Sequence, residues 1–326
     1  MNDPAARARP IIVRAPTRID LGGGWTDVPP YCDKEGGFVC NIAINRYATA
    51  TLSTDETYDA GRDGASDAAQ AESSLIAAAV RRAKLKNVHI TLHSDFPVSA
   101  GLGGSSAASA AVLGAIAVAQ SRDWVRAEIA EEGRRIEVEE LGVAGGRQDH
   151  YAATHGGALA LTFTDRVAVR ALQPSRETIT QFEQRALLIY TGESRISATT
   201  ITGVLDAYLA GDPGVCDALA AMREIARSMA IALEGGDLDS LGSLLADHWV
   251  HQRALHPAIT TPRIDEIVMR AHGAGALGWK PMGASGGGCV LVFCREDRVS
   301  PVREVIAPLG TFVPFAVDRG GLAQLQ

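Results

Sequence analysis

The most constraining feature of the sequence is a glycine- and serine-rich run at residues 97–108, PVSAGLGGSSAA. Apolar and polar residues alternate over Val88–His93 just before it, which predicts a strand. The Ala-rich segment Ser105–Gln120 that follows is apolar on nearly every side, which predicts a buried helix. Glycines in such a turn leave backbone N–H groups free to face an anion, and the helix N-terminus adds positive potential. The pattern therefore predicts a strand–loop–helix unit that holds a phosphate group.

Three better-known glycine motifs are either absent from the sequence or only weakly matched by it. A P-loop is excluded because the sequence contains no Gly-Lys pair. The dinucleotide-type spacing at 273–278 follows a predicted helix instead of a strand, so it is a weak match. The stretch at 283–287 has the spacing of a hydrolase nucleophile elbow, but a strand is expected after it and the last histidine of the chain is His272.

The length and the periodic pattern predict an α+β protein built from two halves. A chain of 326 residues suits two domains or one large two-part unit, and we predict the division at residue 175, giving domains 10–175 and 176–326. Strands are predicted over 10–21, 38–52, 88–93, 158–163, 167–173, 186–191, 289–293 and 311–317. Helices are predicted over 73–84, 105–120, 123–141, 197–210, 214–233, 238–254, 262–273 and 301–309.

Composition excludes several classes of partner. The net charge is −7 and no block of Lys or Arg stands out, so neither a nucleic acid nor an anionic membrane surface is expected to bind. No apolar run reaches membrane-spanning length, and the first ten residues do not resemble a signal peptide. Five cysteines without C-x-x-C spacing indicate reduced thiols, and we expect a cytoplasmic protein.

Two carboxylates separated by twelve residues form a candidate catalytic pair. Glu137 lies near the end of a predicted helix, and Asp149 follows in the glycine-rich turn GGRQDHYAATHGG. For phosphoryl transfer, the first suits Mg²⁺ and the second suits orienting or deprotonating an acceptor hydroxyl. Arg147 is predicted to lower the pKa of Asp149 and to meet phosphate oxygens. A solvated helix face is the alternative reading for Glu137.

Two further glycine clusters are candidate substrate sites. RIDLGGGWTD at 18–27 places two acids and one aromatic residue in a turn, which suits recognition of vicinal hydroxyls. An ordinary surface turn that carries Asp residues is an equally favoured interpretation of residues 18–27. KPMGASGGGC at 280–289 reads as a backbone cradle over the catalytic site.

The three glycine motifs, in this order and spacing, resemble the GHMP kinases over essentially the whole chain. The strings APTRIDLGGGWTDVPPY, GGRQDHYAATHGG, YTGESRIS and KPMGASGGG resemble the sugar-1-kinase branch of that family, which includes heptose 7-phosphate and L-fucose kinases. The resemblance implies a GHMP kinase fold with an S5-domain-2-like N-terminal half and a ferredoxin-like C-terminal half. It also implies ATP and Mg²⁺ as cofactors.

The resemblance also implies roles for individual residues. Asp149 and Arg147 would be catalytic, and Ser105, Ser106 and Glu137 would hold Mg²⁺. The nucleotide would be bound by Gly101, Leu102, Gly103, Gly104, Ser105, Ser106 and Ala107. The acceptor would be bound by Arg18, Asp20, Gly24, Trp25, Thr26, Asp27, Arg195, Lys280, Gly286 and Gly287.

The implied reaction is phosphorylation of an anomeric hydroxyl. D-glycero-D-manno-heptose 7-phosphate would give the 1,7-bisphosphate, for synthesis of the nucleotide sugars of surface polysaccharides. Trp25 resembles the fucokinase pattern, so L-fucose or a related free sugar is the second candidate. A non-catalytic sugar-phosphate sensor is the alternative from another class. The expected partner is a small-molecule sugar phosphate, and a homodimer is left open.

Overall fold

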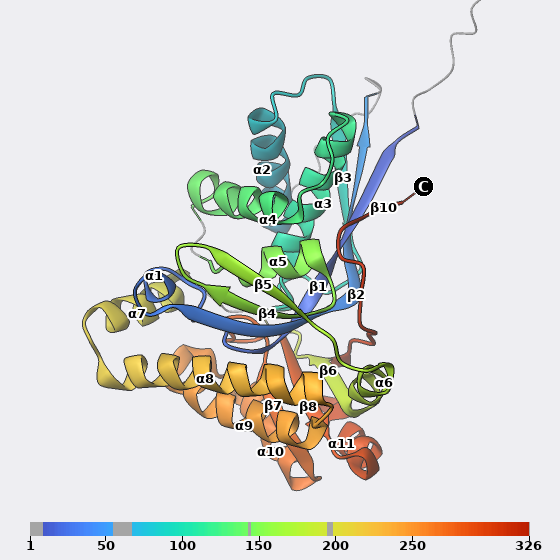
Figure 1. Ribbon diagram of the computed structural model, residues 1–326. Coiled ribbons are helices and arrows are strands. Elements are labelled where there is room, and N and C mark those ends of the chain that lie inside the picture. Colours follow the sequence, from blue (N-terminus) through green and yellow to red (C-terminus); the bar gives the residue numbers. More distant parts are fainter. Residues whose placement is uncertain (1–8, 55–66, 143–144, 194–197, 326) are drawn as a thin grey trace, which may run out of the picture.

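The protein contains two antiparallel sheets that lie one above the other (Figure 1). The computed structural model describes residues 9–54, 67–142, 145–193 and 198–325. The first sheet has the order β10-β1-β2-β4-β5, with β3 paired to β2, and the second has the order β7-β8-β6-β9. The first sheet comprises β1 (Ile11–Gly22), β2 (Gly37–Ser53), β3 (His89–Ser94), β4 (Ala158–Phe163), β5 (Val167–Leu172) and β10 (Ala323–Leu325). The second comprises β6 (Ala186–Tyr190), β7 (Ala276–Pro281), β8 (Cys289–Cys294) and β9 (Thr311–Phe312).

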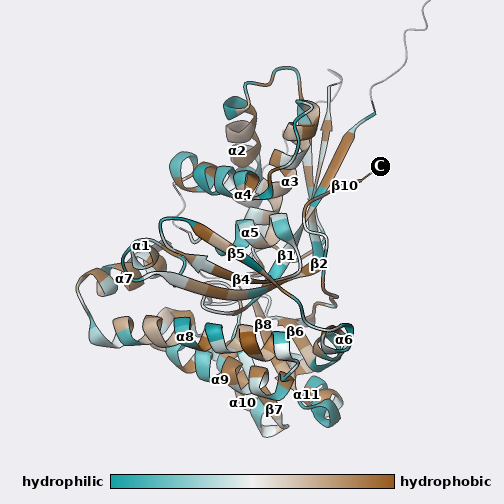
Figure 2. Ribbon diagram, viewed as in Figure 1, coloured by the Kyte–Doolittle hydropathy of each residue, from teal (hydrophilic) through white to brown (hydrophobic). Residues whose placement is uncertain are grey.

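Helices cover both sheets. In the first half these are α1 (Tyr31–Glu35), α2 (Asp67–Arg82), α3 (Gly104–Ala119), α4 (Arg126–Arg135) with a π-helical turn (Ile136–Glu140), and α5 (Gln148–His155). In the second they are α6 (Arg176–Arg185), α7 (Ala198–Leu209), α8 (Pro213–Gly235), α9 (Leu238–Ala254), α10 (Pro262–Gly273) and α11 (Val299–Ile306). Hydrophobic and hydrophilic residues alternate along α8 (Figure 2), as expected of a helix with one buried face. None of these described helices combines the length and the apolar character that a membrane span requires.

The helix that follows the phosphate loop is buried over most of its length, as its composition predicts. Every residue from Ser106 to Ala117 is buried. Its alanines and Gly114 let it approach the sheet closely, because a Cβ on Gly114 would lie 3.0 Å from the side chain of Val13. A close-packed helix of this kind holds the loop at its N-terminus in a fixed position.

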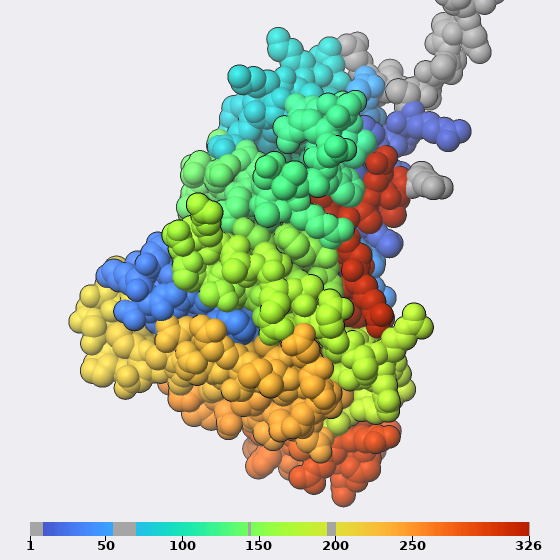
Figure 3. All heavy atoms as spheres, viewed as in Figure 1, coloured from blue at the N-terminus to red at the C-terminus, as the bar shows by residue number. Residues whose placement is uncertain are grey.

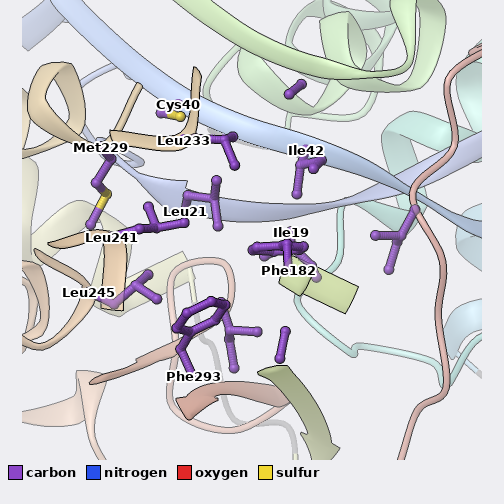
Figure 4. Close-up of a cluster of buried hydrophobic side chains, with 14 of the residues drawn as sticks. Ile19, Leu21, Cys40, Ile42, Phe182, Met229, Leu233, Leu241, Leu245 and Phe293 are labelled. Carbon is purple, nitrogen blue, oxygen red and sulfur yellow. The ribbon is translucent and has the colours of Figure 1, made fainter. Parts of the chain in front are cut away.

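One hydrophobic core joins the two halves. Ile19, Leu21, Cys40 and Ile42 of the first sheet pack with side chains from the second half (Figure 4). Those labelled partners are Phe182, Met229, Leu233, Leu241, Leu245 and Phe293. The last residues of the chain return to the first half (Figure 3), where β10 pairs with β1. The division at residue 175 stays a prediction, and both the core and the last strand cross it.

Several elements differ from the prediction. The sequence pattern missed α1, α5, α6, β7 and β10. The helix expected over 123–141 starts at Arg126 and becomes π-helical at Ile136. The strand expected over 311–317 is β9, only two residues long, followed by an isolated bridge between Val317 and Ile44. The shortest of these, such as α1 and β10, carry too little periodicity to be predicted locally. α6 does carry a helical spacing, with Thr178, Ile179, Phe182 and Arg185 buried.

Candidate active site

The phosphate loop has the backbone geometry that its glycines allow. Gly101 and Gly103 adopt left-handed φ angles of 74° and 75°. A Cβ on Gly101 would lie 2.6 Å from the Met282 carbonyl oxygen, and one on Gly103 would lie 3.1 Å from the Asp149 carboxyl carbon. The first intrahelical bond of α3 runs from the Ala107 N–H to the Gly103 carbonyl. The amides of residues 104–106 therefore precede the helical ladder and suit an anion.

Arg18 connects this loop to the predicted catalytic acid. One guanidinium nitrogen donates to the Gly101 carbonyl oxygen at 2.5 Å, and two others contact Asp149 Oδ1 at 2.8 Å. The Arg18 side chain is 4% exposed, whereas that of Asp149 is 26% exposed. Burial raises the pKa of Asp149 and outweighs the opposing attraction of Arg18. Asp149 is therefore a stronger proton acceptor than an exposed aspartate.

The role predicted for Arg147 does not match this arrangement. Its backbone N–H donates to Asp27 Oδ2 at 2.8 Å, whereas the charge that most lowers the pKa of Asp149 is that of Arg18. The cation beside the catalytic carboxylate is Arg18. Adjacency in the sequence misled the prediction because Asp149 lies in the first turn of a helix, α5, and not in an open turn.

The second predicted carboxylate, Glu137, comes from the π-helical turn and contacts the first turn of α3. Ser105 Oγ donates to Glu137 Oε1 at 3.1 Å, and His150 Nε2 lies 2.8 Å from Glu137 Oε2. Burial opposes ionisation of Glu137, but the hydrogen bonds from His150 and Ser105 outweigh it and hold its pKa below the ordinary value. Ser105 is exposed, whereas Ser106 is buried, so Ser105 is the serine that faces this carboxylate.

These oxygen donors fit Mg²⁺. An ionised carboxylate and a hydroxyl are hard ligands, and Mg²⁺ typically takes one or two protein oxygens together with water and substrate phosphates. Within the described ranges, no three His, Cys, Asp or Glu side chains gather as a metal-binding group. The site suits a metal that shares its coordination with a nucleotide rather than one enclosed by protein.

A cavity of about 150 Å³ is lined in part by Asp149. Its walls come from the loop after β1, the start of α5, α7 and the loop after β7. The lining residues are Arg18, Asp20, Gly24, Trp25, Asp27, Val28, Gly145, Gly146, Gln148, Asp149, Ile201, Gly283 and Ala284. Three carboxylates in so small a space favour a hydroxyl-rich ligand over an anionic group.

Lys280, predicted to meet phosphate, is instead fully buried in β7. It is 0% exposed, and its Nζ contacts Asp20 Oδ2 at 2.7 Å. Burial raises the pKa of Asp20, but Lys280 and Arg18 outweigh it and keep that pKa below its ordinary value. Asp20 therefore lines the cavity as a carboxylate, while Lys280 is held behind it as the counter-ion.

Thr26 and Asp27 also bind protein groups. Thr26 is 0% exposed, and its hydroxyl donates to the Gly23 carbonyl at 2.6 Å. The Thr26 hydroxyl is therefore held by a protein group, and its predicted contact with the sugar stays a prediction. Asp27 lines the cavity, but its Oδ2 accepts the backbone N–H groups of Arg147 and Gln148. It thus fixes the start of α5.

The loop after β7 faces the cavity through residues other than those predicted. Gly286 and Gly287 are buried, and the Gly286 N–H donates to the Ile259 carbonyl at 2.8 Å. Gly283 and Ala284 are the cavity-lining members of this loop. Arg195 lies outside the described residues.

Sequence reasoning missed two polar residues of this region. Gln148 lines the cavity, and its position next to Asp149 was the available signal. His248 accepts a hydrogen bond from the Gly23 N–H at 2.9 Å. Nothing in the sequence indicates this contact, because the two residues are 225 positions apart.

Comparisons with known proteins agree with this geometry. The GHMP kinases N terminal domain matches residues 68–157, and the GHMP kinases C terminal domain matches residues 229–307. D-glycero-alpha-D-manno-heptose 7-phosphate kinase of Campylobacter jejuni is 31% identical over 88% of this chain and 90% of its own length. The bifunctional fucokinase/GDP-fucose pyrophosphorylase of Arabidopsis thaliana is 25% identical over 90% of this chain and 30% of its own length.

The fold matches solved structures of the same kind. The crystal structure of a D-glycero-D-manno-heptose 1-phosphate kinase from Bacteroides thetaiotaomicron superimposes with a TM-score of 0.76 and 26% identity. The match covers 97% of this chain and 99% of that one. The predicted fold class is thereby confirmed. The chain belongs to the GHMP kinase family and is a sugar kinase, an enzyme that transfers a phosphoryl group to an alcohol.

Proposed function

We propose that this enzyme transfers the γ-phosphoryl group of ATP to the anomeric hydroxyl of D-glycero-D-manno-heptose 7-phosphate, giving the 1,7-bisphosphate. One observation carries the proposed reaction geometry. Asp149 lies close to the phosphate loop, because a Cβ on Gly103 would be 3.1 Å from its carboxyl carbon, and it also lines the cavity. A single carboxylate thus borders both places where the reactants would bind, where it could accept the proton of the attacking hydroxyl.

Each nearby residue has a physical task in this proposal. Asp149 accepts the proton of the attacking hydroxyl, aided by its raised pKa. Arg18 holds the Asp149 carboxylate in place and brings positive charge close to the transferring group. The amides of residues 104–106 would hold the nucleotide phosphates, and Ser105 and Glu137 would hold Mg²⁺, which neutralises phosphate charge when bound.

The choice of sugar rests on the relatives. One relative is named for a heptose 7-phosphate and another for a heptose 1-phosphate, so the family evidence favours a heptose.

We place the reaction in the cytoplasm, and we assign Arg195 to the substrate phosphate on its sequence motif alone. A sensor without catalysis is disfavoured because Ser105, Glu137 and Asp149 lie together.

A free sugar such as L-fucose is the second candidate. The described cavity wall presents three aspartates, and its single cation, Arg18, is paired with Asp149. Such a wall suits neutral hydroxyls. A coupled assay of ADP release with heptose 7-phosphate, L-fucose and other free sugars separates the two candidates. A kcat/KM at least about tenfold higher for the heptose phosphate supports the first, and the reverse order rejects it.

The reaction itself is tested by Asp149→Asn. We expect kcat to fall about 100-fold or more, because the proton acceptor is lost, while far-UV circular dichroism and the KM for ATP stay near wild type. Asp165→Asn, at an exposed position in the turn between β4 and β5, is the matched control. Turnover of Asp149→Asn close to that of the control would reject the assigned role.

A further inference from the structure

The loop at residues 22–27, here called the sugar loop, is held by the second half of the chain. His248 on α9 and Lys280 on β7 are both 0% exposed. The first contacts the Gly23 N–H and the second contacts Asp20 at the base of the loop. Neither side chain is among the residues that line the cavity. Both therefore act on any bound sugar only through the loop.

The contact of His248 defines its chemical state. Its Nε2 lies 2.9 Å from the Gly23 nitrogen, so Nε2 is the acceptor and the ring proton is on Nδ1. Burial and the nearby Lys280 charge lower the pKa of His248 to about 3, which keeps the ring neutral. The ring also packs against the backbone here, because a Cβ on Gly22 would lie 3.2 Å from His248 Cδ2.

The shape of the sugar loop depends on the peptide that His248 holds. Gly23 has a φ of 90° and Trp25 a φ of 78°, both in the left-handed region. The Gly23 carbonyl then accepts the Thr26 hydroxyl and backbone N–H. A change in the Gly23 peptide would therefore move Gly24 and Trp25, which both line the cavity. Non-glycine residues persist in this backbone region only where surrounding contacts over-determine them.

We propose that His248 is a positioning residue for the acceptor site. It holds the Gly23 peptide and thereby sets the affinity for the acceptor sugar, without contact with the sugar or the nucleotide. This rests on the proposed function in one respect, that the cavity holds the sugar. No residue of the phosphate loop is among those that line the cavity, so we expect nucleotide affinity to be independent of His248.

The experiment compares His248→Leu with His248→Gln. Leucine fills the space but removes the acceptor, so we expect the KM for the sugar to rise about tenfold, the scale of one lost buried hydrogen bond. The KM for ATP and the kcat at saturating sugar should stay within about threefold of wild type. Glutamine has an amide oxygen that reaches the position of Nε2, and we expect it to restore most of the sugar affinity.

A matched control separates positioning from general stability. Leu245→Ala removes a 0% exposed side chain from the same helix, and Leu245 is not among the cavity-lining residues. It should destabilise the protein yet leave the KM for the sugar unchanged. An unchanged sugar KM in His248→Leu, or an equal rise in Leu245→Ala, would overturn the proposal. If His248→Leu does not fold, His248→Asn provides the same test, since its shorter side chain cannot reach Gly23.

A second readout does not depend on turnover. Hydrogen exchange of a peptide that covers residues 19–27 should be faster in His248→Leu than in wild type, and near wild type in His248→Gln and Leu245→Ala. Failure of the proposed function would appear as no turnover of any sugar by the wild-type enzyme. Failure of the present proposal would appear as equal exchange and equal sugar KM in all variants.

Discussion

A buried histidine that accepts a hydrogen bond makes stability depend on pH. The pKa of His248 is lowered to about 3 by burial, against 6.5 in the unfolded chain. Between these values the unfolded state binds one proton more, so the free energy of unfolding falls as pH falls below about 6.5. The His248→Gln variant lacks this titrating group. Urea unfolding at pH 7.5 and 4.5 should show wild type losing about 2 to 3 kcal/mol more than the variant. Equal losses would contradict the buried, neutral state.

Gly103→Ala should damage the reaction more than the fold. The added Cβ would lie 3.1 Å from the Asp149 carboxyl carbon, at a φ of 75° that L side chains rarely adopt. Because small displacements of a catalytic group are costly, we expect kcat/KM to fall at least about tenfold. Gly273→Ala, with nothing within 4 Å of its Cβ, is the control and should retain activity. Equal activities in steady-state assays would argue against close packing of loop and acid.

The sequence placed the two candidate catalytic carboxylates better than it assigned roles to other polar side chains. Asp149 and Glu137 lie beside the phosphate loop, where their predicted roles would require them. Lys280 and Thr26 were assigned to ligands, although they bind protein groups. A buried cation must find an anion, and the partner of Lys280 is 260 residues away. Local sequence does not reveal such a pairing.

Among the helices, α5 depends on a cap from a distant segment. Asp27 Oδ2 accepts the N–H groups of Arg147 and Gln148 at 2.8 and 2.9 Å. Asp27→Ala removes both bonds, so we expect a loss of about 1 to 3 kcal/mol in urea unfolding and a lower kcat, because Asp149 lies in the first turn of α5. Asp27→Asn keeps an acceptor and, since burial raises the pKa of Asp27 to about 6, should be at least as stable as wild type at pH 7.5. Identical behaviour of the two variants would contradict the capping role.

Long elements were predictable, and irregular ones were not. The ranges of α9, α10 and β4 agree with the pattern to the residue. The π-helical turn at Ile136–Glu140 was predicted as ordinary helix, because one extra residue per turn leaves no mark in local composition. That turn carries Glu137, so the departure lies at the predicted metal site.

For the chain as a whole, the last strand completes the first sheet. Leu322, just before β10, is 2% exposed and packs with the α3 core. Leu322→Ala should cost about 2 to 4 kcal/mol in urea unfolding, as core truncations do. Gln324→Ala, an exposed neighbour on β10, should cost little. A loss confined to Gln324→Ala would contradict the packing described here. The two-half architecture was predictable from the motifs, but the return of residue 322 was not.

The guanidinium of Arg18, which contacts both Gly101 and Asp149, has a consequence for the acceptor site. A guanidinium is planar and rigid, and here it spans the carbonyl of Gly101 and the carboxylate of Asp149. The spacing between the phosphate loop and Asp149 is therefore set by the dimensions of one guanidinium group. Trp25 and Ile201 also line the cavity, so substitutions there should change the space for the acceptor without changing that spacing.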